Sequence, residues 1–332
     1  MVCGVVMAYE NILPFDENEL IDWVAAYYGL VVDDVDLRLG YMSTVAILST
    51  ATQRFVLKCV RKKEDTQRAF LTQMTLVAGL HNHFLPVAEC VMGKDQQYLF
   101  ETDNKIMSLW TFLVGDGFEL GNLQQLHAAG ATLGKMHRVF AQEVTTTRNT
   151  SLGWSDRVAQ LMDVWQGLAT TGGQANVLVA GLSQYLDKWA VPMEKESRIV
   201  IHNDFRAQNL LFHGNEISGI LDLDDVCLSP RIWDVAYALA FFQAVIADRP
   251  LNTKEMVSFV KGYHHHNPIG AYDLSNLPQW LGLALLKGLT LWGQICYLDG
   301  RNSSVQKWLD GYLPLLGQVD AMGGVLQDEL VG

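Results

Sequence analysis

Asp204, Asn209 and Asp222 have side chains whose types and spacing could hold a metal ion beside a proton acceptor. They lie within IVIHNDFRAQNLLFHGNEISGILDLDDV, residues 199–226. Two apolar runs flank the letters HGNE, a pattern that predicts a β-hairpin, and a hairpin returns its second strand beside its first. Asn209 and Asp222 are then expected at one end of the hairpin, where two oxygen ligands suit Mg²⁺. Asp204 is expected just beside them, where a carboxylate can accept the proton of a hydroxyl group.

The letters DLDD add two further carboxylates to this set. Asp224 is a candidate ligand for a second metal ion, whereas Asp225 is expected either to brace the loop or to be solvated. A hairpin with a polar edge and a helix-capping aspartate is the alternative interpretation. We favour the metal site because the spacing, the hairpin and a β-rich segment upstream agree with one another.

The elements that must position these residues fall into two regions. Apolar residues three and four apart predict a helix over DENELIDWVAAYYGL, followed by three short β-rich runs between residues 35 and 60, a helix over 65–80 and two further strands. After Gly121 the periodicity is helical, over residues 122–140, 155–169, 175–190, 231–247, 253–265 and 278–299, and the hairpin is the one clear β signal among them. The sequence therefore predicts an α+β fold, with a β-rich lobe over residues 1–114 and a helical lobe over residues 115–332.

Three segments around the hairpin resemble a known family. HNDFRAQNLLF, ISGILDLDD and PRIWDVAYAL look like the phosphotransfer loop, metal-binding strand and following helix of the protein-kinase-like small-molecule kinases, which include aminoglycoside phosphotransferases, choline kinases and type II homoserine kinases. DENELIDWVAAYYGL, FLTQMTLVAGLHNHFLPV, LWTFLVGD and GATLGKMH look more like the homoserine kinases of this fold. The resemblance implies a protein-kinase-like two-lobe fold, in which a small antiparallel β lobe with a helix precedes a larger, mostly α-helical lobe.

The same resemblance implies ATP and Mg²⁺ as cofactors and a role for each polar residue of the hairpin region. Asp204 is expected to be the catalytic base, and Asn209 and Asp222 to bind Mg²⁺. His202 is expected to be a structural residue of the loop. Asp234, in IWDVAY, is expected to brace the loop by hydrogen bonding to its backbone.

A lysine in the first region completes the expected nucleotide site. Lys58, in RFVLKCV, lies on the third predicted strand, where the kinase pattern V-A-I-K places the lysine that contacts the α and β phosphates. GYMST, between the first two strands, is expected to cover the phosphates. It contains Gly40, and Ser43 and Thr44 would supply hydroxyl and backbone N–H donors.

The sequence indicates less clearly which residue holds Lys58 in position and which residues bind adenine. A glutamate on the next helix usually holds such a lysine, and Gln73 takes that position here. Either Gln73 orients Lys58 by a neutral hydrogen bond, or Glu64 does so from an earlier turn. Adenine is expected to bind backbone groups of the hinge near Thr111 and Leu113.

Composition narrows the classes of partner and the compartment. The 332 residues carry a net charge of -12, which argues against a nucleic-acid-binding surface. The five cysteines are scattered and form no C-x-x-C pair, so a reducing cytoplasm is expected. The apolar stretch over residues 235–247 is too short to span a bilayer, and no membrane role is expected.

These observations predict an ATP- and Mg²⁺-dependent phosphotransferase that acts on a hydroxyl group of a small metabolite. A homoserine-like amino acid or amino alcohol is favoured as the acceptor. The alternatives are an aminoglycoside- or choline-type kinase, or a nucleotide-binding pseudokinase without turnover. Acidic side chains opposite Asp204 would indicate a polyamine acceptor, and a group of aromatic side chains would indicate choline. An arginine or lysine there would indicate an acceptor with a carboxylate. The oligomeric state cannot be predicted from the sequence.

Overall fold

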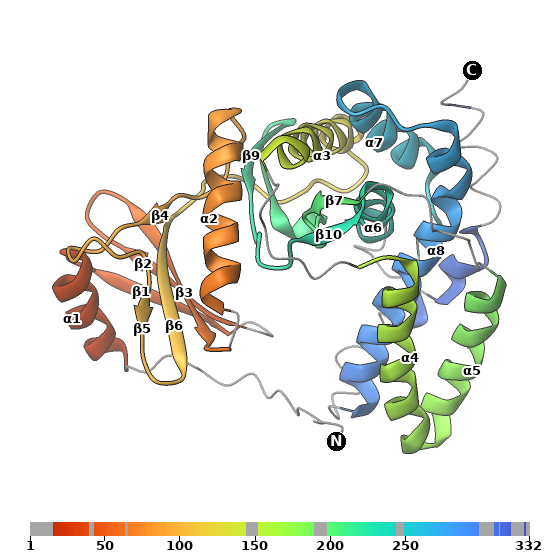
Figure 1. The fold of residues 1–332 in the computed structure, drawn as a ribbon, viewed down its shortest axis with the longest axis horizontal. Coiled ribbons are helices and arrows are strands. Elements are labelled where there is room, and N and C mark those ends of the chain that lie inside the picture. The colour runs from red at the N-terminus through yellow and green to blue at the C-terminus, as the bar shows by residue number, and fades with distance from the viewer. Residues whose placement is uncertain are drawn as a thin grey trace.

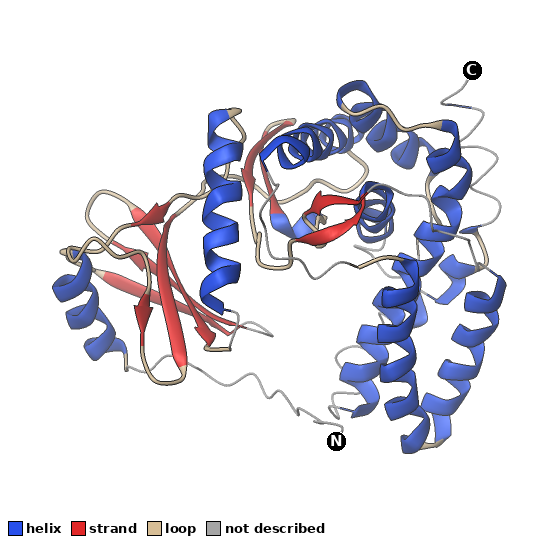
Figure 2. Cartoon of the chain, in the orientation of Figure 1, coloured by secondary structure: helices blue, strands red, loops and turns tan. Residues whose placement is uncertain are grey.

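The computed structural model describes residues 16–39, 43–63, 66–143, 152–188, 198–243, 249–298, 309–311, 313–319 and 329. Figure 1 shows a β-rich part formed by the N-terminal strands of the described chain, and a larger part built mainly of helices. Figure 2 makes the same division visible by secondary structure, because most strands lie on one side of the view and most helices on the other. The α+β class predicted from the sequence is therefore confirmed.

The β-rich part is an antiparallel sheet with the strand order β1-β2-β3-β6-β4, to which β5 adds by pairing with β6. Its strands are β1 (Asp34–Leu39), β2 (Ser43–Ser49), β3 (Arg54–Arg61), β4 (Cys90–Val91), β5 (Phe100–Glu101) and β6 (Lys105–Thr111). The predicted meander between residues 35 and 60 corresponds to β1, β2 and β3, which pair in sequence order. This register sets Lys58 opposite Val45 on one side and Ser108 on the other.

Two helices cover the two faces of this sheet. Helix α1 (Glu17–Tyr28) begins with a capping box between Asp16 and Glu19 and buries Leu20 and Val24 against one face. Helix α2 (Thr66–Asn82) lies on the other face, toward the helical part (Figure 1). Alternate residues of β3 are buried, so Lys58 points toward α2 and away from the core under α1.

The larger part consists of α3 (Leu123–Glu143), α4 (Trp154–Thr171), α5 (Gly173–Lys188), α6 (Arg231–Gln243), α7 (Thr253–His266) and α8 (Ala271–Gly293), with a π-helical turn at Gln294–Leu298. Helices α3 and α7 approach each other closely because glycines face the partner backbone. A Cβ at Gly130 would lie 1.9 Å from the carbonyl oxygen of Phe259, and one at Gly262 would lie 2.1 Å from that of His127. Glycine is therefore required at both positions.

Two small sheets lie among these helices. Strands β8 (Leu210–His213) and β9 (Glu216–Ile220) form the predicted hairpin. Strands β7 (Arg198–Ile201) and β10 (Cys227–Pro230) form a second antiparallel pair that the sequence analysis did not predict. Because β7 and β10 lie on either side of the hairpin in sequence, their pairing brings the segments on both sides of it together.

Helix α8 begins earlier than predicted, at Ala271 instead of residue 278. Pro278 lies inside the helix, and the first two turns are retained because Leu274 and Leu277 are buried in the core. By length and composition Ala271–Leu298 could cross a membrane, but 67% of its most apolar window is buried inside the protein. Its apolar surface is thus used to pack against α6 and its neighbours.

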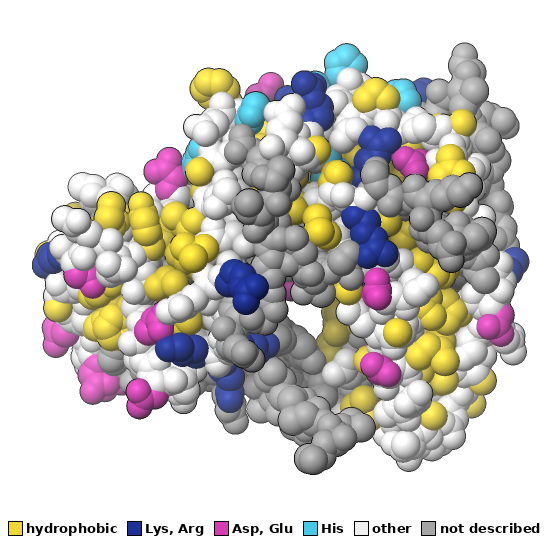
Figure 3. All heavy atoms as spheres, viewed as in Figure 1, with side chains coloured by type: hydrophobic (Ala, Val, Ile, Leu, Met, Phe, Trp, Pro, Cys, Tyr) yellow, Lys and Arg dark blue, Asp and Glu magenta, His cyan; other side chains and the backbone are white. Residues whose placement is uncertain are grey.

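The surface and the cysteines agree with the composition. On the described part of the face in Figure 3, basic and acidic side chains are scattered among each other and do not gather into a patch of one sign. Cys59, Cys90, Cys227 and Cys296 are free thiols. The predicted cytoplasmic location stays a prediction.

Candidate active site

Two connections between the lobes fix the position of the hairpin. The backbone N–H of Ile220, at the end of β9, donates to Pro86 in the segment after α2 at 2.7 Å. Phe212, on β8, exchanges two backbone hydrogen bonds of 2.8 Å with Asp116, which follows β6. The hairpin end that carries Asp222 is therefore held by hydrogen bonds to segments that lead directly from α2 and from the sheet with Lys58.

The loop over residues 202–209 is braced from below by Asp234 on α6. This fully buried carboxylate accepts hydrogen bonds from the backbone N–H groups of His202, at 2.7 Å, and Asn203, at 2.8 Å. His137 Nε2 lies 3.1 Å from the same carboxylate. Burial raises the pKa of Asp234, but hydrogen bonding to His137 and the charges nearby lower it more, and the pKa lies below its ordinary value. The predicted bracing role of Asp234 is confirmed.

The side chains of His202 and Asn203 connect the loop to the segment after the hairpin. His202 is fully buried, and its Nε2 lies 3.0 Å from the carbonyl oxygen of Leu221. Asn203 has a positive φ of 66°, which asparagine tolerates better than most residues. Its Nδ2 donates to the carbonyl oxygen of Asp225 at 3.1 Å, and its Oδ1 accepts from Trp233 Nε1 at 2.9 Å. His202 and Asn203 therefore act as scaffold, as predicted for His202.

Asp204 is the carboxylate that this loop presents. Oδ1 accepts a hydrogen bond of 2.7 Å from the Tyr237 hydroxyl, and Oδ2 accepts one of 2.8 Å from Asn209 Nδ2. Arg206 Nε lies 3.2 Å from Oδ2, while 13% of the Asp204 side chain stays exposed. These partners fix the orientation of the carboxylate, so Asp204 can accept a proton from a hydroxyl group placed against it.

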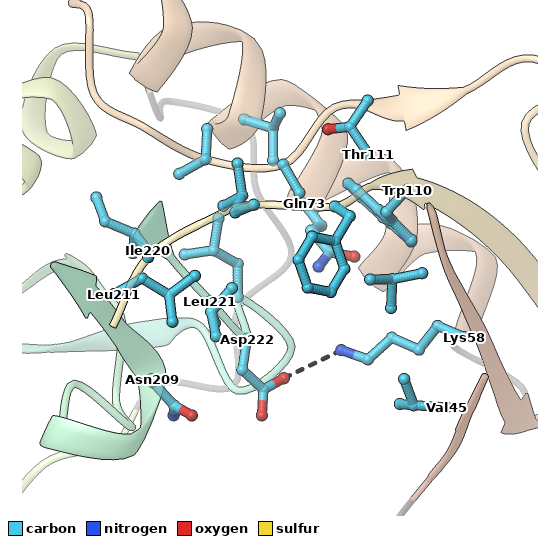
Figure 4. A pocket seen from close by; sticks show the side chains of 18 of the residues that line it. Val45, Lys58, Gln73, Trp110, Thr111, Asn209, Leu211, Ile220, Leu221 and Asp222 are labelled. Carbon is cyan, nitrogen blue, oxygen red and sulfur yellow. Dashed lines mark hydrogen bonds and ion pairs between the residues drawn. The ribbon is translucent and has the colours of Figure 1, made fainter. Parts of the chain in front are cut away.

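Lys58 reaches across from the sheet to the segment after the hairpin, as the dashed line in Figure 4 shows. Its Nζ lies 3.1 Å from Asp222 Oδ1 and 2.6 Å from Asp224 Oδ2. Burial lowers the pKa of Lys58, but the two carboxylates raise it more, and the pKa lies above its ordinary value. Desolvation raises the pKa of Asp222, but Lys58 lowers it more, and that pKa lies below its ordinary value. Lys58 and Asp222 are therefore both charged at neutral pH.

Gln73 on α2 contacts this cluster in a way that differs from the prediction. Its Nε2 donates to Asp224 Oδ1 at 3.0 Å, whereas the partners of Lys58 are Asp222 and Asp224. Gln73 thus supports Lys58 indirectly, by orienting the carboxylate that Lys58 binds. A glutamine suits this position because a glutamate would bring a second negative charge against Asp224. Glu64, the other candidate, lies outside the described residues.

A pocket with a cavity volume of about 420 Å³ lies between the lobes, in the size range of small-molecule sites. One end is polar, with Lys58, Asn209 and Asp222 (Figure 4). The rest is mainly apolar and is lined from both lobes, by Val45, Val56, Val77, Trp110, Leu211 and Ile220 among others. The pocket thus combines an apolar slot with a charged end.

Of the other predicted nucleotide-binding residues, only some line the pocket. Thr111 and Leu113 line the pocket, although the Thr111 N–H and hydroxyl are both hydrogen-bonded to the Glu89 backbone. Thr44 is only 1% exposed and lies on the β2 face opposite to the pocket-lining Val45, so its hydroxyl points away from the pocket, contrary to the prediction. Gly40 and the side chain of Ser43 lie outside the described residues.

The donor set fits a hard divalent cation. Asn209 uses its Nδ2 for the backbone oxygen and carboxylate of Asp204, and its side-chain oxygen lies toward Asp222 at the pocket (Figure 4). An amide oxygen and a carboxylate suit Mg²⁺, which keeps waters and phosphate oxygens as its other ligands. Within the described residues no group of three or more His, Cys, Asp or Glu side chains could hold a metal. Asp224 is occupied by Lys58 and Gln73, so its metal-binding role stays a prediction.

Comparison with known proteins assigns the family. Residues 36–267 match the sequence profile described as the phosphotransferase enzyme family, and this segment contains Lys58, Asp204, Asn209 and Asp222. The chain belongs to this family. The predicted membership is therefore confirmed.

Individual phosphotransferases resemble the chain over most of its length. The homoserine kinase of Zymomonas mobilis is 25% identical over 262 residues, 76% of each protein, and that of Methylobacillus glycogenes is 24% identical over 277 residues, 83% of each. Among solved structures, a microcompartment-associated aminopropanol kinase has a TM-score of 0.71 at 17% identity, covering 93% of this chain and 99% of that one. An amicoumacin kinase bound to AMP-PNP and Ca²⁺ has a TM-score of 0.69 at 19% identity, covering 95% and 94%. These structures confirm the protein-kinase-like two-lobe fold.

Two residues beside Asp204 were missed by the sequence analysis. Tyr237, one turn after Asp234 on α6, donates to Asp204. Lys287 on α8 lies 4.6 Å from the centre of the Tyr237 ring. Burial, together with Arg157, lowers the pKa of Lys287 to about 8, against the attraction of Asp204 and Asp225. The one available signal was a single lysine in the apolar run LGLALLKGLTLW.

Proposed function

We propose that the chain is an ATP- and Mg²⁺-dependent kinase that phosphorylates an alcohol group of a small amino acid or amino alcohol, of the homoserine type. The observation that carries this proposal is the shared position of Asn209. Its amide nitrogen holds the Asp204 carboxylate, and its amide oxygen lies toward Asp222 at the pocket (Figure 4). One side chain thus joins the group that would accept the proton to the group that would hold the metal.

In the proposed reaction, Asp204 accepts the proton of the acceptor hydroxyl as that oxygen bonds to the γ-phosphorus. The bond from this phosphorus to the β–γ bridging oxygen breaks, and ADP leaves with the electron pair. Lys58 neutralises the phosphates, and Tyr237 and Asn209 keep Asp204 in position. Asn209 and Asp222 would hold Mg²⁺, which supplies charge neutralisation on the β and γ phosphates when bound.

The apolar part of the pocket is proposed to bind adenine, with backbone groups of the Thr111–Leu113 segment as its polar partners. The walls from β2, β3 and the hairpin would enclose the ring on both sides. The names of the relatives support the acceptor class, since two are homoserine kinases and one structural neighbour is an aminopropanol kinase.

ADP release should be measured with L-homoserine, 3-amino-1-propanol and an aminoglycoside, for the wild type and for Asp204→Asn. We expect ADP release with L-homoserine or 3-amino-1-propanol, and loss of about 10³-fold or more in the variant because the base is neutral. The thermal shift produced by ATP and Mg²⁺ should be retained in Asp204→Asn. A thermal shift in the wild type without turnover of any acceptor would favour a pseudokinase and refute the proposal.

A further inference from the structure

Lys287 lies beside the candidate base Asp204 and has no anionic partner among the described residues. It is half-buried in α8 and, among the described residues, makes neither a hydrogen bond nor an ion pair. Its ammonium lies 4.6 Å from the centre of the Tyr237 ring and 5.6 Å from that of Trp233. Because Tyr237 donates to Asp204, Lys287 stands one side chain away from the carboxylate that would receive the acceptor hydroxyl.

Asp225 supplies the opposite charge in the same region. Its side chain is exposed, and its carboxylate makes no hydrogen bond with the residues that the structure describes. The Asn203 amide fixes its position by donating to its backbone carbonyl. Each charge acts on the pKa of the other group, yet Lys287 and Asp225 form no ion pair. Both charges are therefore free to bind a ligand.

The positions of Lys287 and of the rings that it contacts argue against two other acceptor classes. A polyamine would bring several positive charges toward the ammonium of Lys287, which lies over the Tyr237 ring beside Asp204. A quaternary ammonium needs open aromatic faces, but here the protein's own cations lie over Trp233 and Tyr237. On the side of Asp204 where Lys287 lies, the protein thus favours an acceptor that brings a negative charge.

We propose that Lys287 and Asp225 determine acceptor specificity by binding the carboxylate and the ammonium of a zwitterionic hydroxy amino acid, whose hydroxyl then lies against Asp204. This inference rests on the proposed function, because it assigns the acceptor of the same site. The two charges and Asp204 form three separate contacts with one small molecule. A charge-assisted hydrogen bond in such a site gives both affinity and orientation.

Three probes separate the two contacts. L-Homoserine carries both charges and the hydroxyl; 3-amino-1-propanol lacks only the carboxylate; 4-hydroxybutanoate lacks only the ammonium. For the wild type, we expect kcat/KM for L-homoserine to exceed that for either analogue by roughly 10- to 100-fold, since each lost contact leaves a charged group without its partner.

Lys287→Met should reduce kcat/KM for L-homoserine roughly 10- to 100-fold while reducing that for 3-amino-1-propanol far less, so the preference between the two probes is lost. Lys287→Arg should restore part of the preference. Asp225→Asn should instead remove the preference for L-homoserine over 4-hydroxybutanoate. Lys254→Met is the matched control, because Lys254 is exposed at the start of α7.

Equal loss with all three probes in Lys287→Met would overturn the inference, since Lys287 would then serve the fold or the transferred phosphoryl group. A wild type that prefers 3-amino-1-propanol would also overturn it, but would leave the proposed kinase function intact. If the wild type transfers phosphate to none of the probes although ATP and Mg²⁺ raise its melting temperature, the proposed function itself fails.

Discussion

The Tyr237 hydroxyl donates a 2.7 Å hydrogen bond to Oδ1 of Asp204, and thereby joins α6 to the loop over residues 202–209. The same helix carries Asp234, which holds the backbone of the loop. One helix thus fixes both the path of the loop and the direction of its carboxylate. Removing the Tyr237 hydroxyl separates the second effect from the first.

Tyr237→Phe removes the donor and keeps the ring. We expect kcat to fall roughly 10-fold, because Asp204 loses one of its charge-assisted hydrogen bonds but keeps Asn209 and Arg206. The KM for ATP should change little, since Tyr237 does not line the pocket in which ATP is proposed to bind. Steady-state kinetics with L-homoserine check this, with Tyr98→Phe on the exposed surface as the control. An unchanged kcat would mean that Asp204 needs no support from the Tyr237 hydroxyl.

Asp234→Asn should lower the free energy of unfolding by roughly 3 kcal/mol, because an amide NH₂ would face a buried backbone N–H donor. Urea denaturation measures this, with Asp163→Asn on the exposed side of α4 as the control. A loss no larger than that of the control would show that the loop holds its shape without Asp234.

The same pair of proteins gives a pH dependence. The pKa of Asp234 is lower in the folded than in the unfolded protein, so its contribution is present above the ordinary value of about 3.9 and is lost as the pH falls through the lower, folded value. The stability difference between wild type and Asp234→Asn should therefore narrow below pH ~4. A difference that stays constant down to pH ~2 would assign the effect to packing alone.

Gln73→Glu restores the residue type usual for such a lysine partner, yet we expect it to weaken nucleotide binding. The new carboxylate would lie against Asp224 Oδ1, where Gln73 now donates, and like charges at this distance repel. We expect the dissociation constant of AMP-PNP with Mg²⁺ to rise roughly 3- to 10-fold by calorimetry, because partial exposure screens the repulsion. Tighter binding would indicate that Lys58 exchanges Asp224 for the new glutamate.

Lys287→Met should increase the stability of the protein. Burial lowers the pKa of Lys287 to about 8, so the folded state disfavours its charged form. Replacing it by a neutral side chain of similar length should raise the free energy of unfolding at pH 7 by on the order of 2 kcal/mol. The gain should shrink as the pH rises from about 8 to above the unfolded value of about 10.4, because the wild-type lysine then loses its proton in both states. A destabilised variant would show that the cation–aromatic contacts outweigh the burial.

The pH dependence of specificity follows from the same group. Below pH about 8, Lys287 is charged and can bind a carboxylate; above it, the charge is lost. The ratio of kcat/KM for L-homoserine to that for 3-amino-1-propanol should therefore fall as the pH rises through about 8. Lys287→Arg should shift this fall to higher pH, since a guanidinium keeps its proton. A ratio that is flat from pH 6 to 9.5 would exclude Lys287 as the source of the preference.

The sequence could predict the features that depend on local pattern and spacing. The turn at HGNE predicted the hairpin of β8 and β9, and the positions of Asn209 and Asp222 followed from it. Strands β7 and β10 escaped prediction because each has four residues and pairs across the whole hairpin region. Lys287 escaped for a similar reason: it comes from a helix distant in sequence, and its meaning depends on which charges the fold brings near it.

The position of Gln73 could be predicted from the sequence, but its hydrogen-bond partner could not. Matching its helix to the family pattern placed it correctly beside the lysine cluster, since it lies in the same pocket. The identity of its partner depends on where Asp224 lies after the positive-φ residue Asp222, whose φ is 61°. Such a backbone turn is set by the surrounding hydrogen bonds and is not visible in helical periodicity.

Lys58 contacts both Asp222 and Asp224, so its ammonium neutralises the two carboxylates in the absence of a metal ion. Metal entering alone would face an ammonium already in its place, and phosphates entering alone would meet two carboxylates. The phosphates draw Lys58 away from the carboxylates, and the metal neutralises the carboxylates that repel the phosphates. We therefore expect the binding free energies of the metal and the nucleotide to be coupled. By thermodynamic reciprocity, each ligand raises the affinity of the other by the same factor. Titrating AMP-PNP with and without Mg²⁺ measures the coupling, which Lys58→Met should reduce. The nucleotide-free protein would then bind the metal alone or the nucleotide alone weakly, and would bind the metal–nucleotide complex more tightly.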